Sequence, residues 1–416
     1  MTLAPADDGP HDVRMRGFAR RTTVAAAWEW IDEHARQLPC EPVPLDRAGG
    51  RVLAAEVTSG VDVPGFDRSM MDGYALRADQ TRGADGYNRL ELEIAGESLP
   101  GRPFAGTLSR GQAVRIMTGA PIPAGTDAVL PAERVEVSGS RLSVLDEVPP
   151  GKNIGRQGED ISAGTKVLSP GRVLRPQDLG VLASIGISTI DVVRRPRVRI
   201  VITGNELLPP GSAPQASKIM DANGPMLAAL VARDGGIAIN PGIVPDEPAA
   251  ILSAMRDDAD VVLVSGGSSV GQEDFAPSLL AKHGELAIHG IAMRPSSPAG
   301  MGLLMGKLVF LLPGNPVSCL CAYDFFGGRA LRLLGGRKKE WPYPARRMKL
   351  SRKLVSTVGR LDYARVRIVN DRVEPVSISG ASILSSTTRA DGFVAIPADS
   401  EGYPEGAEVD VFLYDS

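Results

Sequence analysis

The first regular pattern of apolar and polar residues in the chain predicts a helix. Between about residues 23 and 36, apolar side chains recur at three- and four-residue steps, which places them on one face of an α-helix. Thr22 or Thr23 can cap its start with a hydroxyl oxygen. This amphipathic helix is expected to pack against another part of the protein. Its apolar positions are Val24, Ala27, Trp28 and Ile31.

The pattern changes between about residues 52 and 148, where short alternating stretches are separated by Gly and Pro turns. Leu90, Leu92 and Ile94 alternate with Glu91 and Glu93, which is the two-residue period of a half-buried strand. The segment therefore predicts a small β domain. Residues 176–195 have a partly helical pattern, and a domain boundary is expected near residue 196.

After residue 196, continuous apolar runs alternate with helical patterns. The runs Val198–Ile202, Val261–Val264 and Leu308–Leu312 predict buried strands, and Met226 to Val231 predicts a helix between the first two. Buried strands that alternate with helices indicate a parallel α/β sheet. Beyond Gly335, a proline-containing stretch precedes alternating segments that predict a C-terminal β unit of about 75 residues. These segments are 363–369, 393–396 and 409–413.

The length and composition limit the possible classes of protein. A chain of 416 residues predicts roughly three domains. The net charge of -3 gives no general attraction to nucleic acid or to anionic lipid. No segment approaches eighteen consecutive apolar residues, and the N-terminus lacks the apolar core of a secretion signal, so a cytoplasmic protein is expected. The cysteines Cys40, Cys319 and Cys321 lack metal-site or redox spacing.

Polar loops follow the three predicted buried strands. They begin at Thr203-Gly204-Asn205-Glu206, at Ser265-Gly266-Gly267-Ser268-Ser269, and at Pro313-Gly314-Asn315-Pro316-Val317-Ser318. In an open parallel sheet, ligands bind beyond the carboxyl ends of the strands, so the three loops should converge on one rim.

Two of these loops have features of anion sites. The glycine loop lacks the Lys and Ser or Thr that a nucleoside triphosphatase loop requires, but its backbone N–H groups could approach an anion closely. An ordinary tight turn explains the same glycines equally well. Asn315 and Pro316 fit the start of a helix, from which backbone donors and Ser318 would point at a phosphate or molybdate. A simple helix start is the alternative explanation.

Acidic residues accompany these loops. Carboxylates beside an anion pocket imply a divalent cation such as magnesium, although each acid alone could be a solvated surface charge. The four scattered histidines show no zinc-hydrolase spacing, and no GxSxG elbow is present. The acids concerned are Asp67, Asp72, Asp160, Glu206, Asp246 and Asp274.

Several longer motifs resemble the molybdopterin molybdenumtransferase family, to which MoeA and the gephyrin E domain belong. The resemblance is collinear over nearly the whole chain. The motifs are PGFDRSMMDGYALR at 64–77, IMTGAPIPAGTDAV at 116–129, GKNIGRQGEDISAGTKVL at 151–168, DLGVLASIG at 178–186, TGNELLPPG at 203–211, SGGSSVGQEDF at 265–275, LPGNPVS at 312–318 and GRLDYARVR at 359–367.

This resemblance implies a multidomain α/β plus β fold and a homodimer with a site shared between subunits. The α/β domain would be of the molybdopterin-binding type, with a sheet that is mostly parallel. The expected domains are a discontinuous N-terminal mixed helical and β dimerisation unit (15–50 and 150–195), an inserted β domain (51–149), the α/β domain (196–340) and a C-terminal β-barrel-like domain (341–416).

The resemblance also implies the reaction. Adenylylated molybdopterin and molybdate would be the substrates, Mg²⁺ would assist cleavage of the pyrophosphate link, and AMP would leave. Transient partners would be a molybdopterin adenylyltransferase and recipient molybdoenzymes. The implied catalytic residues are Asp67, reaching across the dimer, and Asp160, Glu206, Asp246 and Asp274, of which the last three would bind the metal.

The implied substrate site includes residues from most of the motifs. The serine that follows a glycine in the family's last motif can be matched either to Ser382 or to Ala381. The expected substrate and molybdate contacts are Thr118, Gly204, Gly266, Gly267, Ser269, Arg294, Ser297, Asn315, Ser318, Arg365 and Ser382.

The chain departs from the family in the segment commonly written MKPGKP, which here is Met293 to Pro298. Arg294 keeps one positive charge, whereas Ser297 replaces a second lysine. The lost charge predicts weaker molybdate binding by about 1 to 3 kcal/mol, unless Arg365 compensates for it.

Other functions are compatible with the same residues. A cofactor carrier of the same fold would bind without turnover, and a scaffold role would need added modules. An adenylyltransferase would not need the flanking β domains. No residue separates molybdate from tungstate.

Overall fold

The computed structural model describes residues 21–267, 275–377 and 380–414. These residues form two compact units. Unit 1 comprises Met1–Glu41, Gly50–Val52 and Asp191–Ser416, and unit 2 comprises Pro42–Gly49 and Leu53–Ile190.

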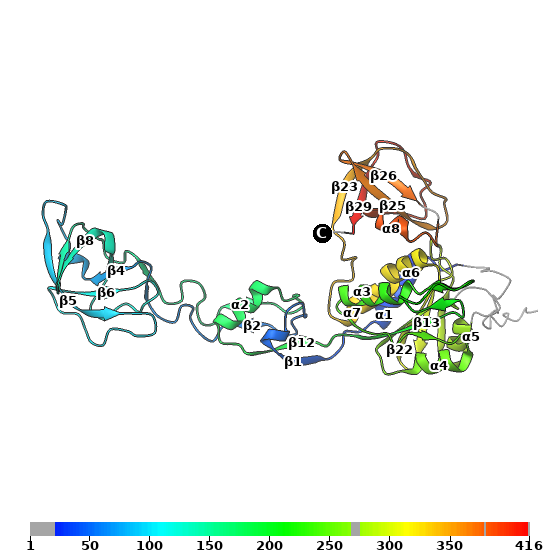
Figure 1. Ribbon diagram of the computed structural model, residues 1–416, viewed down its shortest axis with the longest axis horizontal. Helices are drawn as coiled ribbons and strands as arrows, with labels where there is room; N and C mark the ends of the chain where they lie inside the picture. Colours follow the sequence, from blue (N-terminus) through cyan, green and yellow to red (C-terminus); the bar gives the residue numbers. More distant parts are fainter. Residues whose placement is uncertain (1–20, 268–274, 378–379, 415–416) are drawn as a thin grey trace, which may run out of the picture. The chain divides into compact units, whose positions relative to one another are not determined.

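Unit 1 is built around the predicted α/β sheet, whose strand order is β16-β13-β18-β22-β21-β19, with β17 also paired to β13 (Figure 1). The strands β13, β16, β17, β18 and β22 are parallel, while at one edge β21 pairs antiparallel with β22 and β19 pairs antiparallel with β21. The prediction of a mostly parallel sheet is therefore confirmed. The strands are β13 (Arg197–Thr203), β16 (Ile237–Ile239), β17 (Ile243–Val244), β18 (Val261–Ser265), β19 (Glu285–His289), β21 (Gly300–Leu304) and β22 (Lys307–Leu312).

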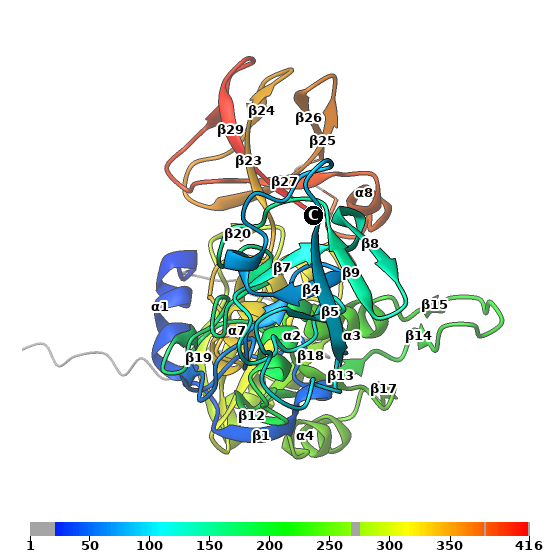
Figure 2. The ribbon, with the colours of Figure 1, turned by 90° about the vertical axis from the view of Figure 1, so that its left-hand side faces the viewer.

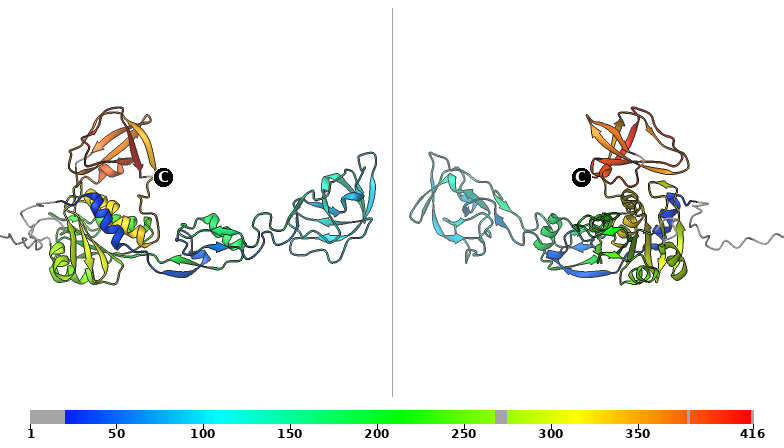
Figure 3. Two further views of the ribbon diagram at one scale, coloured as in Figure 1. Left: turned by 180° about the vertical axis from the view of Figure 1, so that it is seen from behind. Right: turned by 45° about the vertical axis from the view of Figure 1, so that its right-hand side comes forward.

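Helices cover both faces of this sheet, which explains its continuous apolar runs. In β13, Ile200 and Ile202 face a core that includes α1 and α3, whereas Val201 faces the core that includes α4 and α5. Figures 1 and 3 show these two groups of helices on opposite faces. The helices are α1 (Val24–His34), α3 (Asn223–Arg233), α4 (Pro248–Arg256), α5 (Phe275–His283), α6 (Pro316–Ala322) and α7 (Gly328–Leu334).

Helix α1 has the predicted start and the predicted apolar face. Thr23 Oγ1 accepts a hydrogen bond from Ala26 N over 3.2 Å, which is an N-cap. Val24, Ala27 and Ile31 are buried in the core that also contains α7. The expectation that this helix packs against another part of the protein is confirmed.

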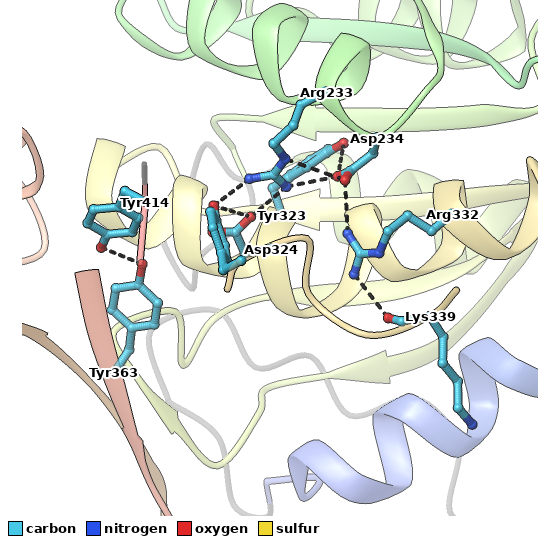
Figure 4. Close-up of polar contacts among 9 residues, drawn as sticks. Arg233, Asp234, Tyr323, Asp324, Arg332, Lys339, Tyr363 and Tyr414 are labelled. Carbon is cyan, nitrogen blue, oxygen red and sulfur yellow. Dashed lines mark hydrogen bonds and ion pairs between the residues drawn. The ribbon is translucent and has the colours of Figure 1, made fainter. Parts of the chain in front are cut away.

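Buried ion pairs join the end of α3 to the turn that follows α6 (Figure 4). Asp234 accepts from Arg233 over 2.9 Å and from Tyr323 OH over 3.0 Å, and it pairs with Arg332 over 3.1 Å. Arg233 also donates to Asp324 over 2.9 Å. Tyr323 and Asp324 belong to the π-helical turn η4 (Tyr323–Gly327), which joins α6 to α7. Because the start of α3 and the start of α6 both face the sheet edge, this network sets their mutual position.

The C-terminal part of unit 1 is a closed barrel with strand order β25-β26-β23-β29-β27, closed by the β25–β27 pairing (Figure 2). The expected barrel-like domain is therefore confirmed as a fold. β20 (Met293–Arg294), which lies between β19 and β21 in sequence, extends the barrel sheet by pairing with β25 in parallel register. The barrel strands are β23 (Ala345–Leu350), β25 (Leu361–Val369), β26 (Arg372–Ser377), β27 (Gly392–Ile396) and β29 (Glu408–Leu413).

Unit 2 contains the predicted β structure in a sheet of order β7-β4-β6-β5-β9-β8 (Figure 1). The alternation at Leu90 to Ile94 lies in β5, as predicted. Short pairs β2–β11 and β3–β10 join residues before and after this sheet. The elements are β2 (Val57–Thr58), β3 (Arg68–Ser69), β4 (Gly73–Leu76), β5 (Leu90–Ser98), β6 (Gln112–Ile116), β7 (Ala128–Pro131), β8 (Val135–Ser138), β9 (Arg141–Val144), β10 (Ile154–Gly155), β11 (Lys166–Leu168) and α2 (Pro176–Ser184).

Candidate functional site

A cleft of about 540 Å³ lies at the carboxyl edge of the α/β sheet. It is lined by the loops that follow β13 and β18 and by the start of α6, so the three predicted polar loops do converge on one rim. Predicted site residues in its lining are Gly204, Glu206, Asp246, Gly266, Gly267, Asn315 and Ser382.

The glycine loop after β18 passes very close to the end of β13. A Cβ on Gly266 would lie 2.0 Å from the carbonyl oxygen of Thr203, and Gly266 has a φ of +102°. Only glycine fits this close approach, because any side chain would collide with the neighbouring backbone. This packing accounts for Gly266 without any ligand. It also brings the backbone of the loop to the wall of the cleft.

The two described carboxylates of the proposed metal set differ in how they are held. Asp246 Oδ1 accepts a hydrogen bond from Thr203 Oγ1 over 2.8 Å, whereas Glu206 is exposed beside Gly204. Among the described residues, no group of three His, Cys, Asp or Glu side chains is placed to hold a metal ion. Asp274 and Ser269, which were also assigned to the site, lie outside the described residues.

The start of α3 adds two polar residues that sequence reasoning missed. Asp221 Oδ1 accepts from Gly224 N over 2.9 Å, and Asn223 Nδ2 donates to Ser265 Oγ over 2.9 Å and to Gly314 O over 2.8 Å. Both residues line the cleft and are buried. They follow β15 (Ile219–Met220), a strand too short to recognise from its pattern. Asn223 thus ties the loops after β18 and β22 together.

The predicted helix start at Asn315 and Pro316 is confirmed, but its capping differs from the expected pattern. The Asn315 side chain makes no capping bond, and its Oδ1 accepts from Ser382 Oγ over 3.0 Å. Val317 N donates to Ala381 O over 3.0 Å. This donor therefore binds the C-terminal domain and is not directed at a ligand. Asn315 lines both this cleft and a second one.

The second cleft, of about 730 Å³, contains four of the predicted molybdate contacts, namely Arg294, Ser297, Asn315 and Ser318. Arg294 forms a bidentate ion pair with the buried Asp362, and one of its two contacts, Nε to Oδ1, measures 3.0 Å. The positive charge that the sequence placed here is therefore partly neutralised. Asp362 was not identified from the sequence because its pairing depends on the register of β20 and β25.

Arg365 is completely buried in the barrel strand β25 and lines neither cleft. Burial and then the nearby Asp324 raise the pKa of the Cys321 thiol, and the Arg365 charge opposes this shift. Burial likewise raises the pKa of Cys319 to about 12, and Ser265 Oγ lies 3.6 Å from its sulfur. Both thiols are buried.

The remaining predicted residues lie in unit 2. Asp67 accepts from Gln157 N over 2.8 Å and from Arg156 over 2.7 Å, and these two contacts lower its pKa. Thr118 donates from both N and Oγ1 to Asp72 over 2.7 Å, which lowers the pKa of Asp72. Asp160 is exposed. Asp67 and Asp72 therefore stay ionised at neutral pH.

Family models match nearly all of the described chain. Residues 22–186 match the MoeA N-terminal region (domain I and II), and residues 199–332 match a probable molybdopterin binding domain. Residues 347–414 match the MoeA C-terminal region (domain IV). The matched regions follow one another in the order that the sequence motifs predicted.

Curated relatives and solved structures agree with these matches. Molybdopterin molybdenumtransferase 2 of Mycobacterium tuberculosis is 34% identical over 403 residues, covering 92% of this chain and 98% of that protein. The molybdopterin molybdenumtransferase of Haemophilus influenzae is 34% identical over 381 residues, covering 89% and 93%. The crystal structure of a molybdopterin biosynthesis MoeA protein from Pyrococcus horikoshii aligns with a TM-score of 0.81 at 32% identity, covering 95% and 100%.

The fold and the site thus define a multidomain protein with a molybdopterin-binding type of α/β domain. The chain belongs to the MoeA family of molybdopterin molybdenumtransferases, which are transferases of molybdenum cofactor biosynthesis. The resemblance and the fold class inferred from the sequence are both confirmed.

Proposed function

We propose that this chain inserts molybdate into adenylylated molybdopterin, releasing AMP and producing the molybdenum cofactor. The observation that carries this proposal is a pair of chemically different clefts that share Asn315. One cleft has carboxylates and closely approaching glycine backbone, and the other has arginines and hydroxyls. A substrate with a pyrophosphate and an oxyanion to be captured needs both environments.

The 540 Å³ cleft suits the pyrophosphate and its cation. Glu206 and Asp246 line it from the ends of β13 and β17, and Gly267 lines it from the loop after β18. Thr203 orients Asp246 by its 2.8 Å hydrogen bond. The backbone around Gly267 can approach phosphate oxygens without obstruction by a side chain.

Magnesium fits this donor set by its chemistry. Mg²⁺ prefers oxygen ligands and is commonly bound through one or two carboxylates together with substrate phosphates and water. Glu206 and Asp246 supply two such carboxylates, and we keep Asp274 in the proposed set. When bound, the cation would neutralise phosphate charge and favour departure of AMP.

The 730 Å³ cleft suits molybdate. Arginine and hydroxyl donors bind oxyanions by charge-assisted hydrogen bonds, and Arg294, Ser297 and Ser318 provide them. Tungstate matches the same chemistry in charge and nearly in size. Asn315 would contact the ligand where the two clefts adjoin. Gly204, Gly266, Ser269, Arg365 and Ser382 also remain assigned to the substrate site.

We also propose a cytoplasmic homodimer in which Asp67 completes the site of the other subunit, and Thr118 and Asp160 stay assigned to the substrate site and the catalytic set. The Asp67 carboxylate, held by Arg156 and Gln157, has a fixed orientation for such a role. An adenylyltransferase would supply the substrate, and apo-molybdoenzymes would accept the product. No helix among the described residues is long and apolar enough to cross a membrane.

The decisive experiment measures AMP release from adenylylated molybdopterin by the purified protein with Mg²⁺, with and without molybdate. A second step transfers the product into an apo-molybdoenzyme. We expect molybdate-dependent AMP release and active holoenzyme. Tight binding of finished cofactor without AMP release would overturn the proposal and identify a carrier.

A further inference from the structure

The buried carboxylate of Asp362 organises one wall of the 730 Å³ cleft. Parallel pairing of β20 with β25 sets Arg294 beside Asp362 in register, and the two side chains form the bidentate pair. Arg360 Nε lies 3.4 Å from Asp362 Oδ1, and Ser356 Oγ donates to Asp362 Oδ2 over 2.8 Å. The Asp362 side chain is fully buried, so its negative charge acts on the two guanidinium groups with little screening by water.

The two arginines differ in how many of their donors remain available. Arg294 uses Nε and Nη2 on Asp362. Arg360 makes the 3.4 Å ion pair, and its buried Nε has no hydrogen-bond partner within the described chain. The Arg360 side chain is 36% exposed and lines the cleft. Arg360 is therefore a guanidinium held beside Asp362, and its Nε–H has no hydrogen-bond acceptor among the described residues.

A second unsatisfied group lies in the same wall. The hydroxyl oxygen of Ser297 is buried and has no hydrogen-bond partner among the described residues. Buried donors without acceptors are uncommon in native proteins, because leaving them unpaired is unfavourable. Two of them in one cleft indicate that the wall is completed by a ligand rich in acceptor oxygens.

The charge of the cleft limits which ligand that is. Every charged residue in its described lining is an arginine, namely Arg21, Arg294 or Arg360, and Asp362 lies behind the lining. Even after pairing with Asp362, the wall keeps an excess of positive charge. A compact dianion with several acceptor oxygens fits this arrangement better than a neutral or cationic ligand.

We propose that Arg360 binds the oxyanion directly, and that Asp362 is a positioning residue that holds Arg294 and Arg360 at the cleft wall. The inference rests on the proposed function, because it names the groups that recognise the molybdate of that reaction. Arg360 thereby places a further positive charge in the wall where Ser297 provides only a hydroxyl.

Molybdate binding to the full-length protein, measured by titration calorimetry without pterin substrate, tests the role of Arg360. We expect R360Q to weaken binding by roughly 10- to 100-fold, the range for losing a charge-assisted hydrogen bond. R360K should recover part of the affinity, because lysine restores the positive charge but not the planar set of N–H donors of the guanidinium group. The matched control R372Q removes an exposed arginine of the same barrel and should bind like the wild type.

The role of Asp362 is tested by whether D362N strengthens or weakens molybdate binding. If the carboxylate acted only through its charge, D362N would tighten molybdate binding by removing a nearby negative charge. A positioning role predicts the opposite, at least about fivefold weaker binding, because both guanidinium groups lose their anchor. S356A, which removes the hydrogen bond from Ser356 to Asp362, should weaken molybdate binding about twofold to threefold. This variant replaces D362N in the experiment if D362N does not fold.

The outcomes separate this inference from the proposed function. Unchanged molybdate affinity in R360Q, or tighter binding in D362N or S356A, would overturn the inference while leaving molybdate-dependent AMP release intact. Wild-type protein that binds no molybdate and releases no AMP would overturn both. Thermal melts of each variant identify losses that are due to unfolding.

Discussion

Thr203 Oγ1 donates a hydrogen bond to Asp246 Oδ1 over 2.8 Å, which joins the last residue of β13 to the loop after β17. The two strands are parallel neighbours, with Thr203 opposite Val244. This register brings the hydroxyl and the carboxylate together at the carboxyl edge of the sheet. Asp246 can therefore face the cleft in one orientation without depending on a ligand.

Replacing Thr203 with valine should lower the rate of AMP release about tenfold. Valine keeps the β-branched shape but removes the hydroxyl donor, and a lost hydrogen bond of about 1.4 kcal/mol corresponds to that factor. Steady-state kinetics at saturating Mg²⁺ provide the measurement. T58V, in an exposed strand position, is the control. A wild-type rate in T203V would show that this hydrogen bond does not serve the reaction.

Replacing Glu206 with glutamine should raise the Mg²⁺ concentration needed for half-maximal activity by about tenfold. Glutamine keeps the size of the side chain but removes the negative charge that attracts the cation. The measurement is AMP release as a function of Mg²⁺ concentration. Glu247 is exposed and next to Asp246 in sequence, so E247Q is a matched control. An unchanged Mg²⁺ requirement in E206Q would remove Glu206 from the proposed metal set.

Replacing Asp234 with asparagine should destabilise unit 1 by about 3 to 5 kcal/mol, because it leaves buried arginines without their counter-charge. The Asp234 side chain is fully buried and contacts Arg233, Arg332 and Tyr323 (Figure 4). Urea unfolding followed by tryptophan fluorescence gives the change.

The control for Asp234 is an exposed ion pair. Asp258, whose side chain is 88% exposed, pairs with Arg197 over 2.5 Å, and D258N should cost less than about 1 kcal/mol. Equal destabilisation by D234N and D258N would contradict the importance given to the buried network.

Asp178 should make a pH-dependent contribution to the stability of unit 2. Hydrogen bonds from Arg172 and then Arg175 lower its pKa well below the ordinary value of 3.8. Because the folded-state pKa is the lower one, the contribution is present above about pH 4 and is lost as the pH falls further. The two arginines are partly exposed, so we expect only about 1 to 2 kcal/mol.

The measurement for Asp178 compares wild type with D178N by denaturant unfolding at several pH values. The difference should be constant between pH 5 and 8 and should shrink towards pH 3, within the range set by the lowered pKa. A difference that grows as the pH falls would show the opposite sign of coupling.

Local sequence patterns determined the elements and the family of this protein. The three-and-four spacing at Val24 to Ile31 is a property of one helix, and the apolar runs at Val198, Val261 and Leu308 follow from strands buried on both faces. The convergence of three polar loops followed from the geometry of parallel sheets. Each of these inferences needs only residues near each other in the chain, or a general rule of sheet topology.

Tertiary structure alone decided how individual site residues are used. Arg294 and Asp362 are 68 residues apart, and only the pairing of β20 with β25 brings them together. Val317 N binds Ala381 O because the C-terminal domain packs at the start of α6. Asn223 reaches Ser265 and Gly314 only once three loops share one edge. Long-range pairing and burial are properties of the folded chain, so no local pattern could reveal them.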